Sequence, residues 1–168
     1  MKSITLIGMP GSGKSTIGRI LAKKVSMKFL DVDECIHEKT GKYIREILKE
    51  YGDNEVIRLE NDMIQTLDLQ NSVISPGGSI VYSPHAMKKL QQETHIMYLE
   101  VSLDTLQKRI GNIVNNSRGI VHYDSLGFDG VYAERQPLFK QYAHDMLEIH
   151  DQNPEEIANI IQGMYCHS

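Results

Sequence analysis

A glycine-rich stretch near the N-terminus, Gly8 to Thr16, carries the strongest chemical signal in the sequence. It reads GMPGSGKST and matches the pattern G-x-x-x-x-G-K-[ST]. Glycines let several backbone N–H groups point into one concavity, and a helix that follows places its positive end there. Lys14 adds a cation for the β and γ phosphates, and Ser15 adds a hydroxyl for Mg²⁺. The stretch therefore predicts a nucleoside triphosphate site, with the phosphates held by Gly11, Ser12, Gly13, Lys14, Ser15 and Thr16.

Two carboxylates, Asp31 and Asp33, follow the second predicted strand. Alternation along a strand would put both on the same side, and open α/β sheets bind their ligands at the carboxyl ends of strands. One carboxylate could hold Mg²⁺ through its waters, while the other accepts hydrogen bonds from a hydroxylated substrate. In the plainer alternative Asp33 caps the next helix and Asp31 is solvated. Beside the glycine-rich stretch, we favour the ligand-binding interpretation.

Two weaker signals lie further along the chain. Gly77 and Gly78 follow the third predicted strand and would allow close approach of a ligand, although a plain turn would use them equally well. Arginines can meet charge on a transferred phosphoryl group or pair with a ligand carboxylate, and an exposed surface position is the alternative for each. The candidates are Arg58, Arg109, Arg118 and Arg135.

The elements that must position these residues alternate between strand and helix. Apolar, β-branched runs predict strands at residues 3–7, 28–30, 72–74, 96–101 and 146–149. Helical spacing predicts helices at residues 14–25, 34–38, 43–50, 55–69, 84–91, 103–110, 129–142 and 154–165. Such alternation implies an α/β fold of three layers, α/β/α, around a five-stranded parallel sheet. Residues 111–128 lack periodicity and predict a long loop of the kind that serves as a mobile lid.

Composition limits the classes of protein to consider. With 168 residues the chain fits a single domain, residues 1–168. Eighteen basic and 22 acidic residues are mixed along the chain and give a charge of −4, which argues against a nucleic-acid partner. Cys35 and Cys166 fit neither a disulfide framework nor a zinc pattern, and no apolar run is long enough for a bilayer. A strand that starts at residue 3 leaves no room for a signal peptide, so we expect a cytoplasmic protein without a membrane partner.

Taken together, the residues resemble the shikimate kinase family over nearly the whole chain. The resemblance is carried by seven motifs: Gly8 to Gly18, Phe29 to Asp33, Thr40 to Ile44, Glu55 to Glu60, Gly77-Gly78, Arg135 to Phe139 and Asn153-Pro154. It implies the nucleoside monophosphate kinase fold, with strand order 2-3-1-4-5, acceptor-binding helices at about 33–62 and a lid at about 111–128. The implied activity is MgATP-dependent phosphorylation of shikimate to shikimate 3-phosphate, a step of aromatic amino-acid biosynthesis, by a monomer.

The resemblance also implies roles for individual residues. On the nucleotide side, Lys14 holds the β and γ phosphates, Ser15 and Asp31 support Mg²⁺, and Arg109 and Pro154 flank the adenine. On the acceptor side, Asp33 orients the ring hydroxyl, Gly77 and Gly78 present N–H groups, and Arg135 clamps the carboxylate. Arg118 is the lid arginine, which contacts the nucleotide as well. The residues expected to take part in the chemistry itself are Lys14, Asp33 and Arg118.

Three departures from the family pattern fall on the acceptor side. Ile57 stands where the family has a second arginine for the shikimate carboxylate, and Arg58 follows one position later, about 100° away around a helix. Ser79 replaces a third glycine. The residues after Arg118 are Gly119-Ile120-Val121 instead of Pro-Leu-Leu.

These departures leave alternatives open. We keep Ile57 and Arg58 as candidate substrate-binding positions. A kinase of the same fold that acts on a different hydroxylated small molecule is the first alternative. A nucleotide-binding regulator without turnover is the second, and an intact set of Asp31, Asp33 and Arg135 argues against it.

Overall fold

The structure is a computed structural model that describes residues 2–110 and 119–166. Within these ranges five strands form one sheet, in which every adjacent pair is parallel. The strands are β1 (Ser3–Ile7), β2 (Lys28–Asp31), β3 (Ser72–Ser75), β4 (Thr94–Val101) and β5 (Asp145–Ile149). Their order in the sheet is β2-β3-β1-β4-β5, which confirms the predicted topology.

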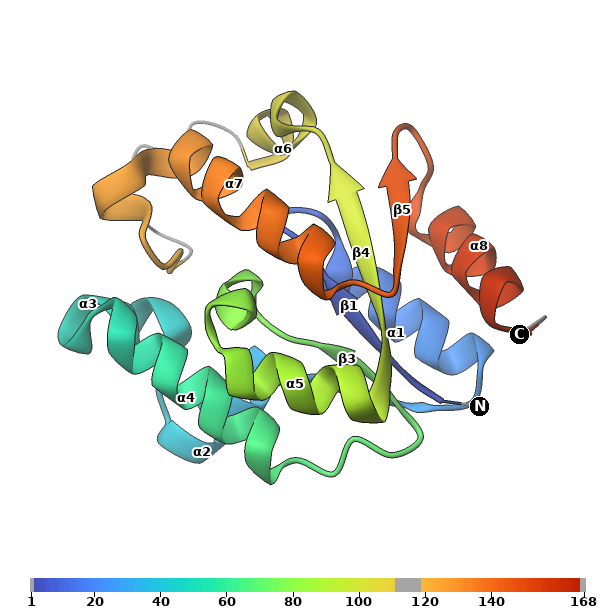
Figure 1. Ribbon diagram of the computed structural model, residues 1–168, viewed down its shortest axis with the longest axis horizontal. Helices are drawn as coiled ribbons and strands as arrows, with labels where there is room; N and C mark the ends of the chain where they lie inside the picture. Colours follow the sequence, from blue (N-terminus) through green and yellow to red (C-terminus); the bar gives the residue numbers. More distant parts are fainter. Residues whose placement is uncertain (1, 111–118, 167–168) are drawn as a thin grey trace.

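Helices cover both faces of the sheet. They are α1 (Lys14–Lys24), α2 (Val32–Thr40), α3 (Ile44–Tyr51), α4 (Asp53–Thr66), α5 (Pro84–Glu93), α6 (Leu103–Ile110), α7 (Tyr123–Tyr142) and α8 (Pro154–Cys166), with a short 3₁₀ helix, η1 (Gly78–Tyr82). Figure 1 shows α1 and α8 on one face, and α5 and α7 on the other with α4 beside α5. The three-layer α/β fold is thus confirmed. No helix in the described ranges has the length and apolar character needed to cross a membrane.

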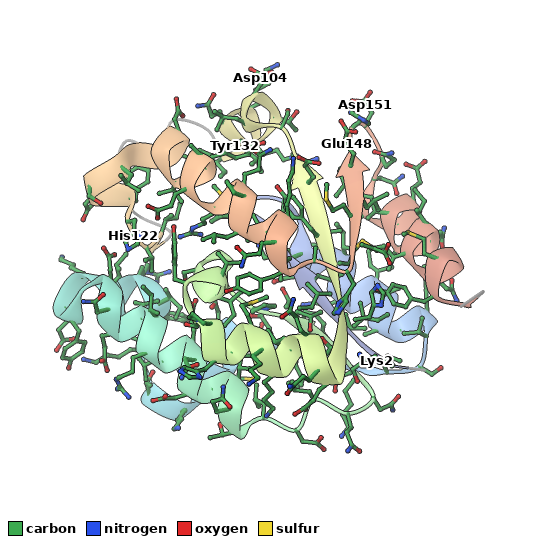
Figure 2. The ribbon with its side chains drawn as sticks, in the orientation of Figure 1. Lys2, Asp104, His122, Tyr132, Glu148 and Asp151 are labelled. Atoms are coloured by element: carbon green, nitrogen blue, oxygen red, sulfur yellow. The ribbon has the colours of Figure 1, made fainter. Side chains whose placement is uncertain are left out.

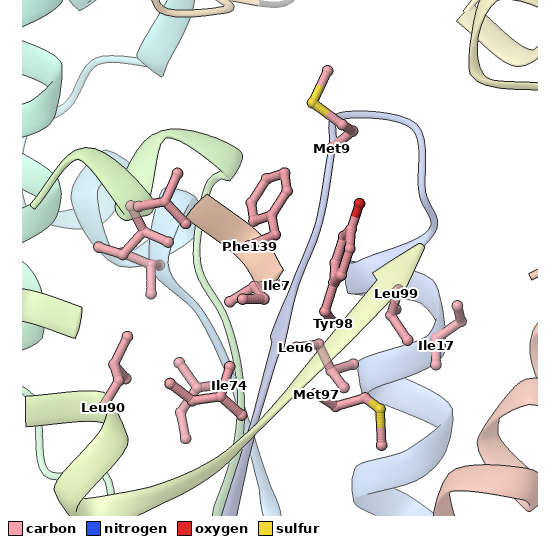
Figure 3. Packing of buried hydrophobic residues seen from close by; sticks show 14 of the residues in the cluster. Leu6, Ile7, Met9, Ile17, Ile74, Leu90, Met97, Tyr98, Leu99 and Phe139 are labelled. Carbon is pink, nitrogen blue, oxygen red and sulfur yellow. The ribbon is translucent and has the colours of Figure 1, made fainter. Parts of the chain in front are cut away.

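The central strand, β1, lies within the hydrophobic core. All five residues of β1 are buried, as expected for a parallel strand that is covered on both faces. In Figure 3 the side chains of β1 and β4 lie between Ile17 of α1 on one side and Leu90 of α5 and Phe139 of α7 on the other. Tyr98 of β4 stacks on Phe139 with ring centroids 5.0 Å apart. The glycine-rich stretch therefore begins at the end of a fully buried strand.

Two predicted boundaries differ from the structure. Helix α7 begins at Tyr123, six residues before the predicted start, and Gly127 interrupts it with a φ of 67°. This break in the helix hides the apolar period, which is why the sequence favoured a loop as far as residue 128. Of the predicted loop, residues 111–118, including Arg118, lie outside the described residues. Helix η1, directly after β3, was not expected from the sequence.

Candidate active site

The predicted site residues converge on one cavity of about 520 Å³ at the carboxyl ends of β1, β2 and β3. The glycine-rich stretch contributes one part of the lining, and Gly119, Ile120, Val121 and Arg135 contribute another. Asp31 and Asp33 lie between them, together with residues 75–79 and Glu60 of α4. Its volume lies within the range of roughly 300–1,000 Å³ that is usual for pockets that bind small molecules.

Backbone conformation explains the glycines of the phosphate wall. Gly13 caps α1 with a φ of 91°, in the left-handed region that side chains disfavour. Gly8 has a φ of 156°, and a Cβ there would lie 2.9 Å from the Leu99 carbonyl oxygen. The loop can therefore pass close to β4 and turn sharply into α1. This conformation presents the positive end of α1 to the cavity, where a phosphate group is stabilised.

Lys14 is held inside this wall by its own loop. Its Nζ donates to the carbonyl oxygens of Gly8, at 2.8 Å, and Met9, at 3.0 Å, and the residue is only 9% exposed. Burial lowers the Lys14 pKa to about 8, with nearby Arg135 acting in the same direction and Asp33 opposing both. The ammonium group is thus placed at the phosphate loop before any ligand binds.

Ser15 and Asp31 form a pair of oxygen groups beside Lys14. The Ser15 hydroxyl donates to Asp31 Oδ2 at 2.9 Å, while Asp31 Oδ1 accepts from the backbone N–H of Asp33 at 3.1 Å. Asp31 is therefore the residue that caps α2, a role that the sequence gave to Asp33 as an alternative. A hydroxyl and a carboxylate suit a Mg²⁺ ion that keeps several waters. Within the described ranges, no group of three or more His, Cys, Asp or Glu side chains is arranged to hold a metal ion by itself.

Asp33 faces the cavity from the first turn of α2. Strand β2 ends at Asp31, so the two carboxylates do not share a strand face as predicted; they are brought together by a direct junction from strand to helix. Asp33 is open to the cavity, yet protein surrounds it on its other sides. This desolvation, followed by the nearby Asp31 charge, raises the Asp33 pKa to about 6, and Lys14 opposes the rise. The carboxylate is thus mainly ionised at pH 7 and able to accept a proton.

Glu60 is a buried carboxyl group to which the sequence analysis gave no role. It is 1% exposed, and its Oε2 accepts a 2.6 Å hydrogen bond from the Ser79 hydroxyl. Burial and the neighbouring Asp33 raise its pKa to about 8, while the Ser79 hydrogen bond, Arg135 and Lys14 oppose the rise. A signal was present, because Glu60 stands four residues from Val56 and Ile64 on the apolar face of α4.

Arg135 lies at the acceptor end and is 1% exposed. Its Nε donates to the Tyr82 hydroxyl at 3.3 Å, and its Nη2 donates to the Val121 carbonyl oxygen at 3.0 Å. The guanidinium also lies over the Tyr82 ring, 5.3 Å from the centroid. An added Cβ on Gly78 would be 2.6 Å from Nη1, so only a glycine leaves room for this arginine. Arg135 is thereby fixed with Nη1 beside Gly78 at the cavity.

A hydrogen-bonded chain supports Arg135 from behind. The Tyr82 hydroxyl donates to Glu134 Oε1, which also contacts His122 Nδ1 at 2.8 Å. The backbone N–H of His122 donates to Asp53 Oδ1 at 3.1 Å, which joins the start of α7 to the start of α4. Figure 2 shows His122 at this position, between α7 and the layer of α3 and α4. The orientation of Arg135 is therefore coupled to the segment that precedes α7.

Comparison with known proteins agrees with this geometry. The family model described as shikimate kinase matches residues 10–165. The chain belongs to the shikimate kinase family. A shikimate kinase of Enterococcus faecalis is 32% identical over 162 residues, which cover 96% of both chains. A shikimate kinase of Mycobacterium avium is 36% identical over 159 residues, or 93% of this chain and 89% of its own. Members of this family are phosphotransferases with an alcohol group as acceptor, and the chain is one of them.

A solved structure extends the likeness to three dimensions. The shikimate kinase of Acinetobacter baumannii, determined in complex with shikimate, matches with a TM-score of 0.89 and 25% identity, over 99% of this chain and 94% of that one. The family relationship thus holds for the sequence, the strand order and the fold alike.

Two predicted acceptor residues lie outside the cavity lining of this family member. Arg58 is exposed on α4, where Glu55 and Asp62 bind its guanidinium with N–O distances of 2.6 and 2.7 Å. Two residues along a helix are separated by about 200°, so Glu60 faces the cavity while Arg58 faces solvent. The structure therefore does not support Arg58 as a substrate ligand. Ile57 packs, half-buried, against the core and is also absent from the lining.

The predicted adenine-side residues are only partly brought together. Arg109, exposed at the end of α6, donates from Nη1 to the Gly11 carbonyl oxygen at 3.3 Å and so lies beside the phosphate loop. Pro154 is the exposed first residue of α8 and does not line the cavity. A residue that the sequence analysis missed, Arg45 of α3, does line it. A charged residue in the first turn of a helix gives no signal that separates it from an ordinary solvated side chain.

Proposed function

We propose that this shikimate kinase family member transfers the γ-phosphoryl group of MgATP to a hydroxyl group of shikimate, giving shikimate 3-phosphate and ADP. The observation that carries the proposal is the single cavity that joins the phosphate loop with Lys14 at one end to Asp33 and Arg135 at the other. A triphosphate needs the first end, and a hydroxylated carboxylic acid needs the second. The relatives that match over nearly their whole length are shikimate kinases.

Each group has a distinct part in the transfer. Lys14 and the N–H groups at the start of α1 hold the phosphates, and Ser15 with Asp31 would hold Mg²⁺, which neutralises phosphate charge. Asp33 accepts the proton of the acceptor hydroxyl as the oxygen bonds to the γ-phosphorus. The bond from that phosphorus to the bridging oxygen breaks, and ADP leaves with its electron pair. Catalysis then rests on positioning and charge neutralisation.

We further propose roles at the edges of the site. The segment between α6 and α7, with Arg118, would close over the substrates and exclude water, since Gly119 to Val121 already line the cavity. Arg109 and Pro154 would flank the adenine, because Arg109 contacts the phosphate loop at Gly11. We also propose a monomer as the working form, because the described residues of this chain supply both the phosphate loop and the acceptor end of the cavity. The absence of clustered basic residues and the two isolated cysteines favour a cytoplasmic enzyme of small metabolites.

A kinase for a different hydroxylated metabolite is the second candidate. Two residues favour it. Ile57 supplies no positive charge for a carboxylate, and the Ser79 hydroxyl already donates its hydrogen bond to Glu60. Coupled ADP release with MgATP, measured on shikimate and on a panel of hydroxylated metabolites, separates the two candidates. We expect turnover of shikimate with KM in the range of about 1 μM to 1 mM. Turnover of another panel member with none of shikimate would overturn the first candidate, and single-turnover transfer to any acceptor would exclude a regulator without activity.

A further inference from the structure

The positive charges of the cavity are few and mostly engaged. In the part of the chain that the structure describes, the cations that line it are Lys14, Arg45 and Arg135. Lys14 donates to two carbonyl oxygens of the phosphate loop and lies where a triphosphate would bind. Against these cations stand the carboxyl groups of Asp31 and Asp33, while Glu60 is kept protonated by its burial. An acceptor that carries a carboxylate adds a further negative charge, which must be met by a cation that is still free.

Arg135 meets this need only in part. Two of its three nitrogens, Nε and Nη2, donate to Tyr82 and Val121. A carboxylate is bound most strongly when two N–H groups approach its two oxygens in parallel. The other three of its five N–H groups, two on Nη1 and one on Nη2, make no hydrogen bond to other described residues. One guanidinium nevertheless brings a single positive charge, so a second cation near the acceptor would strengthen the binding of a carboxylate.

Arg45 is the cavity cation whose guanidinium is free. Among the residues that the structure describes, none forms an ion pair or hydrogen bond with it, whereas Arg19 and Arg58 are paired with carboxylates. Its guanidinium carbon lies 4.7 Å from the centre of the Tyr43 ring, which it covers. Its planar group thus has its donors available to a ligand.

The local structure orients Arg45 although the residue is exposed. The Tyr43 ring stacks on His37 of α2, with centroids 3.9 Å apart and planes within 8°. The Tyr43 backbone is fixed in turn, because its N–H donates to Glu46 Oε2 at 2.7 Å across the first turn of α3. Arginine stacking on an aromatic face restricts the side chain and so reduces the entropy lost when it binds a ligand.

The position of Arg45 also suits an acceptor. It lines the main cavity and a smaller adjoining one of about 230 Å³, and Asp31 and Asp33 line both. Its backbone packs against Gly119, where an added Cβ would lie 2.7 Å from the backbone nitrogen of Arg45. Arg45 thus lies close to Asp33, whose carboxylate would receive the hydroxyl proton. It also lies against Gly119, which precedes Arg135 in the chain. No side chain of α4 other than Glu60 lines the cavity, so α4 contributes no cation.

We propose that Arg45 is a specificity-determining residue that binds the acceptor carboxylate together with Arg135 Nη1. The inference rests on the proposed function, because it takes the acceptor to be a hydroxylated carboxylic acid. Because Ile57 is uncharged, α4 contributes no cation at this end of the site, and Arg45 of α3 contributes the positive charge instead. Recognition then depends on two guanidinium groups from different helices, one from α7 that is buried and one from α3 that is stacked on Tyr43.

The test compares Arg45→Ala with a charge-matched control on the same helix. Lys49→Ala also removes one positive charge from α3, and Lys49 is exposed and absent from the cavity lining. We expect Arg45→Ala to raise the KM for shikimate roughly ten- to a hundredfold, the loss of one charged hydrogen-bonding partner, with KM for ATP unchanged. Arg45→Lys should recover part of the loss, and Lys49→Ala should behave as the wild type.

A second readout separates binding of the carboxylate from a structural effect. The methyl ester of shikimate keeps the ring hydroxyls but lacks the negative charge, so Arg45→Ala should reduce the preference for shikimate over the ester. If Arg45→Ala lost the same factor in kcat/KM on shikimate and on its ester, or kept the wild-type KM for shikimate, the role of Arg45 would be overturned. Turnover of shikimate by the wild type would still uphold the proposed function in that case. Wild-type enzyme that turns over ATP with an uncharged acceptor but not with shikimate would overturn both.

Discussion

Glu60→Gln should change how the stability of the protein depends on pH. The folded protein keeps the Glu60 carboxyl protonated up to about pH 8, whereas its usual pKa is 4.5. Between these values the folded state holds a proton that the unfolded chain has released, so stability falls as pH rises through this window. Below pH 4.5 both states are protonated and the effect is absent. Glutamine has nearly the same shape and keeps an oxygen for the Ser79 hydroxyl, but it does not titrate.

The size of the effect follows from the two pKa values. One pKa unit corresponds to about 1.4 kcal/mol, and integration from pH 5.5 to pH 8 gives a loss of about 3 kcal/mol in the free energy of unfolding from this group. Desolvation is the main cause, since Glu60 is 1% exposed. A loss of this size is a large fraction of the stability of a small domain, roughly 5–15 kcal/mol.

Urea unfolding of the ligand-free protein, followed by circular dichroism at each pH, measures the free energy of unfolding directly. The free energy of unfolding of Glu60→Gln minus that of the wild type should rise by about 3 kcal/mol from pH 5.5 to pH 8, because only the wild type loses the contribution of Glu60. Glu93→Gln removes an exposed carboxylate from α5 and serves as the matched control, with a difference from the wild type that stays constant. If the difference between the wild type and Glu60→Gln were the same at both pH values, Glu60 would be ionised in the folded protein and our account of this end of the cavity would fail.

Three further predictions concern the reaction. Asp33→Asn should lower kcat by roughly 10²–10⁴-fold, the usual contribution of a general base, while calorimetry shows unchanged ADP affinity; normal kcat would remove Asp33 from the proton transfer. Gly78→Ala puts a Cβ 2.6 Å from Arg135 Nη1, so KM for shikimate should rise much more than KM for ATP, and equal changes would argue against Arg135 as an acceptor ligand. Ser15→Ala should raise the Mg²⁺ concentration that gives half-maximal turnover, with circular dichroism as the control for folding; an unchanged Mg²⁺ titration would contradict the pair with Asp31.

The sequence predicted the nucleotide end of the site well because its physics is local. The glycines, Lys14 and Ser15 lie within one short stretch between a buried strand and a helix, and the structure holds them as the spacing requires. Strand order followed from the family resemblance, and the comparisons and the structure confirm it. Asp31 and Asp33 were correctly expected beside each other, although the junction that brings them together is a helix cap, not a shared strand face.

The acceptor end was less predictable because its side chains come from distant parts of the chain. Whether Arg58 or Glu60 faces the cavity depends on the rotation of α4, which packing against its neighbours sets. Arg45 is a polar residue at a helix start, and its stacking on Tyr43 depends on how α2 and α3 meet. The start of α7 was placed too late because Gly127 separates its first turn, which is too short to show an apolar period, from the longer piece that the spacing predicted.

The way in which Lys14 is held links nucleotide affinity to proton concentration. With a pKa of about 8, about half of the free enzyme carries an uncharged Lys14 at pH 8. Triphosphate oxygens favour the ammonium form, so a nucleotide that binds at this pH draws a proton from the buffer with it. By the same linkage, nucleotide affinity weakens as the solution becomes more alkaline, and release of ADP returns the proton. The burial that lowers the Lys14 pKa thus makes the phosphate loop a site of proton exchange at alkaline pH, whereas at neutral pH most of Lys14 is already charged before the nucleotide binds.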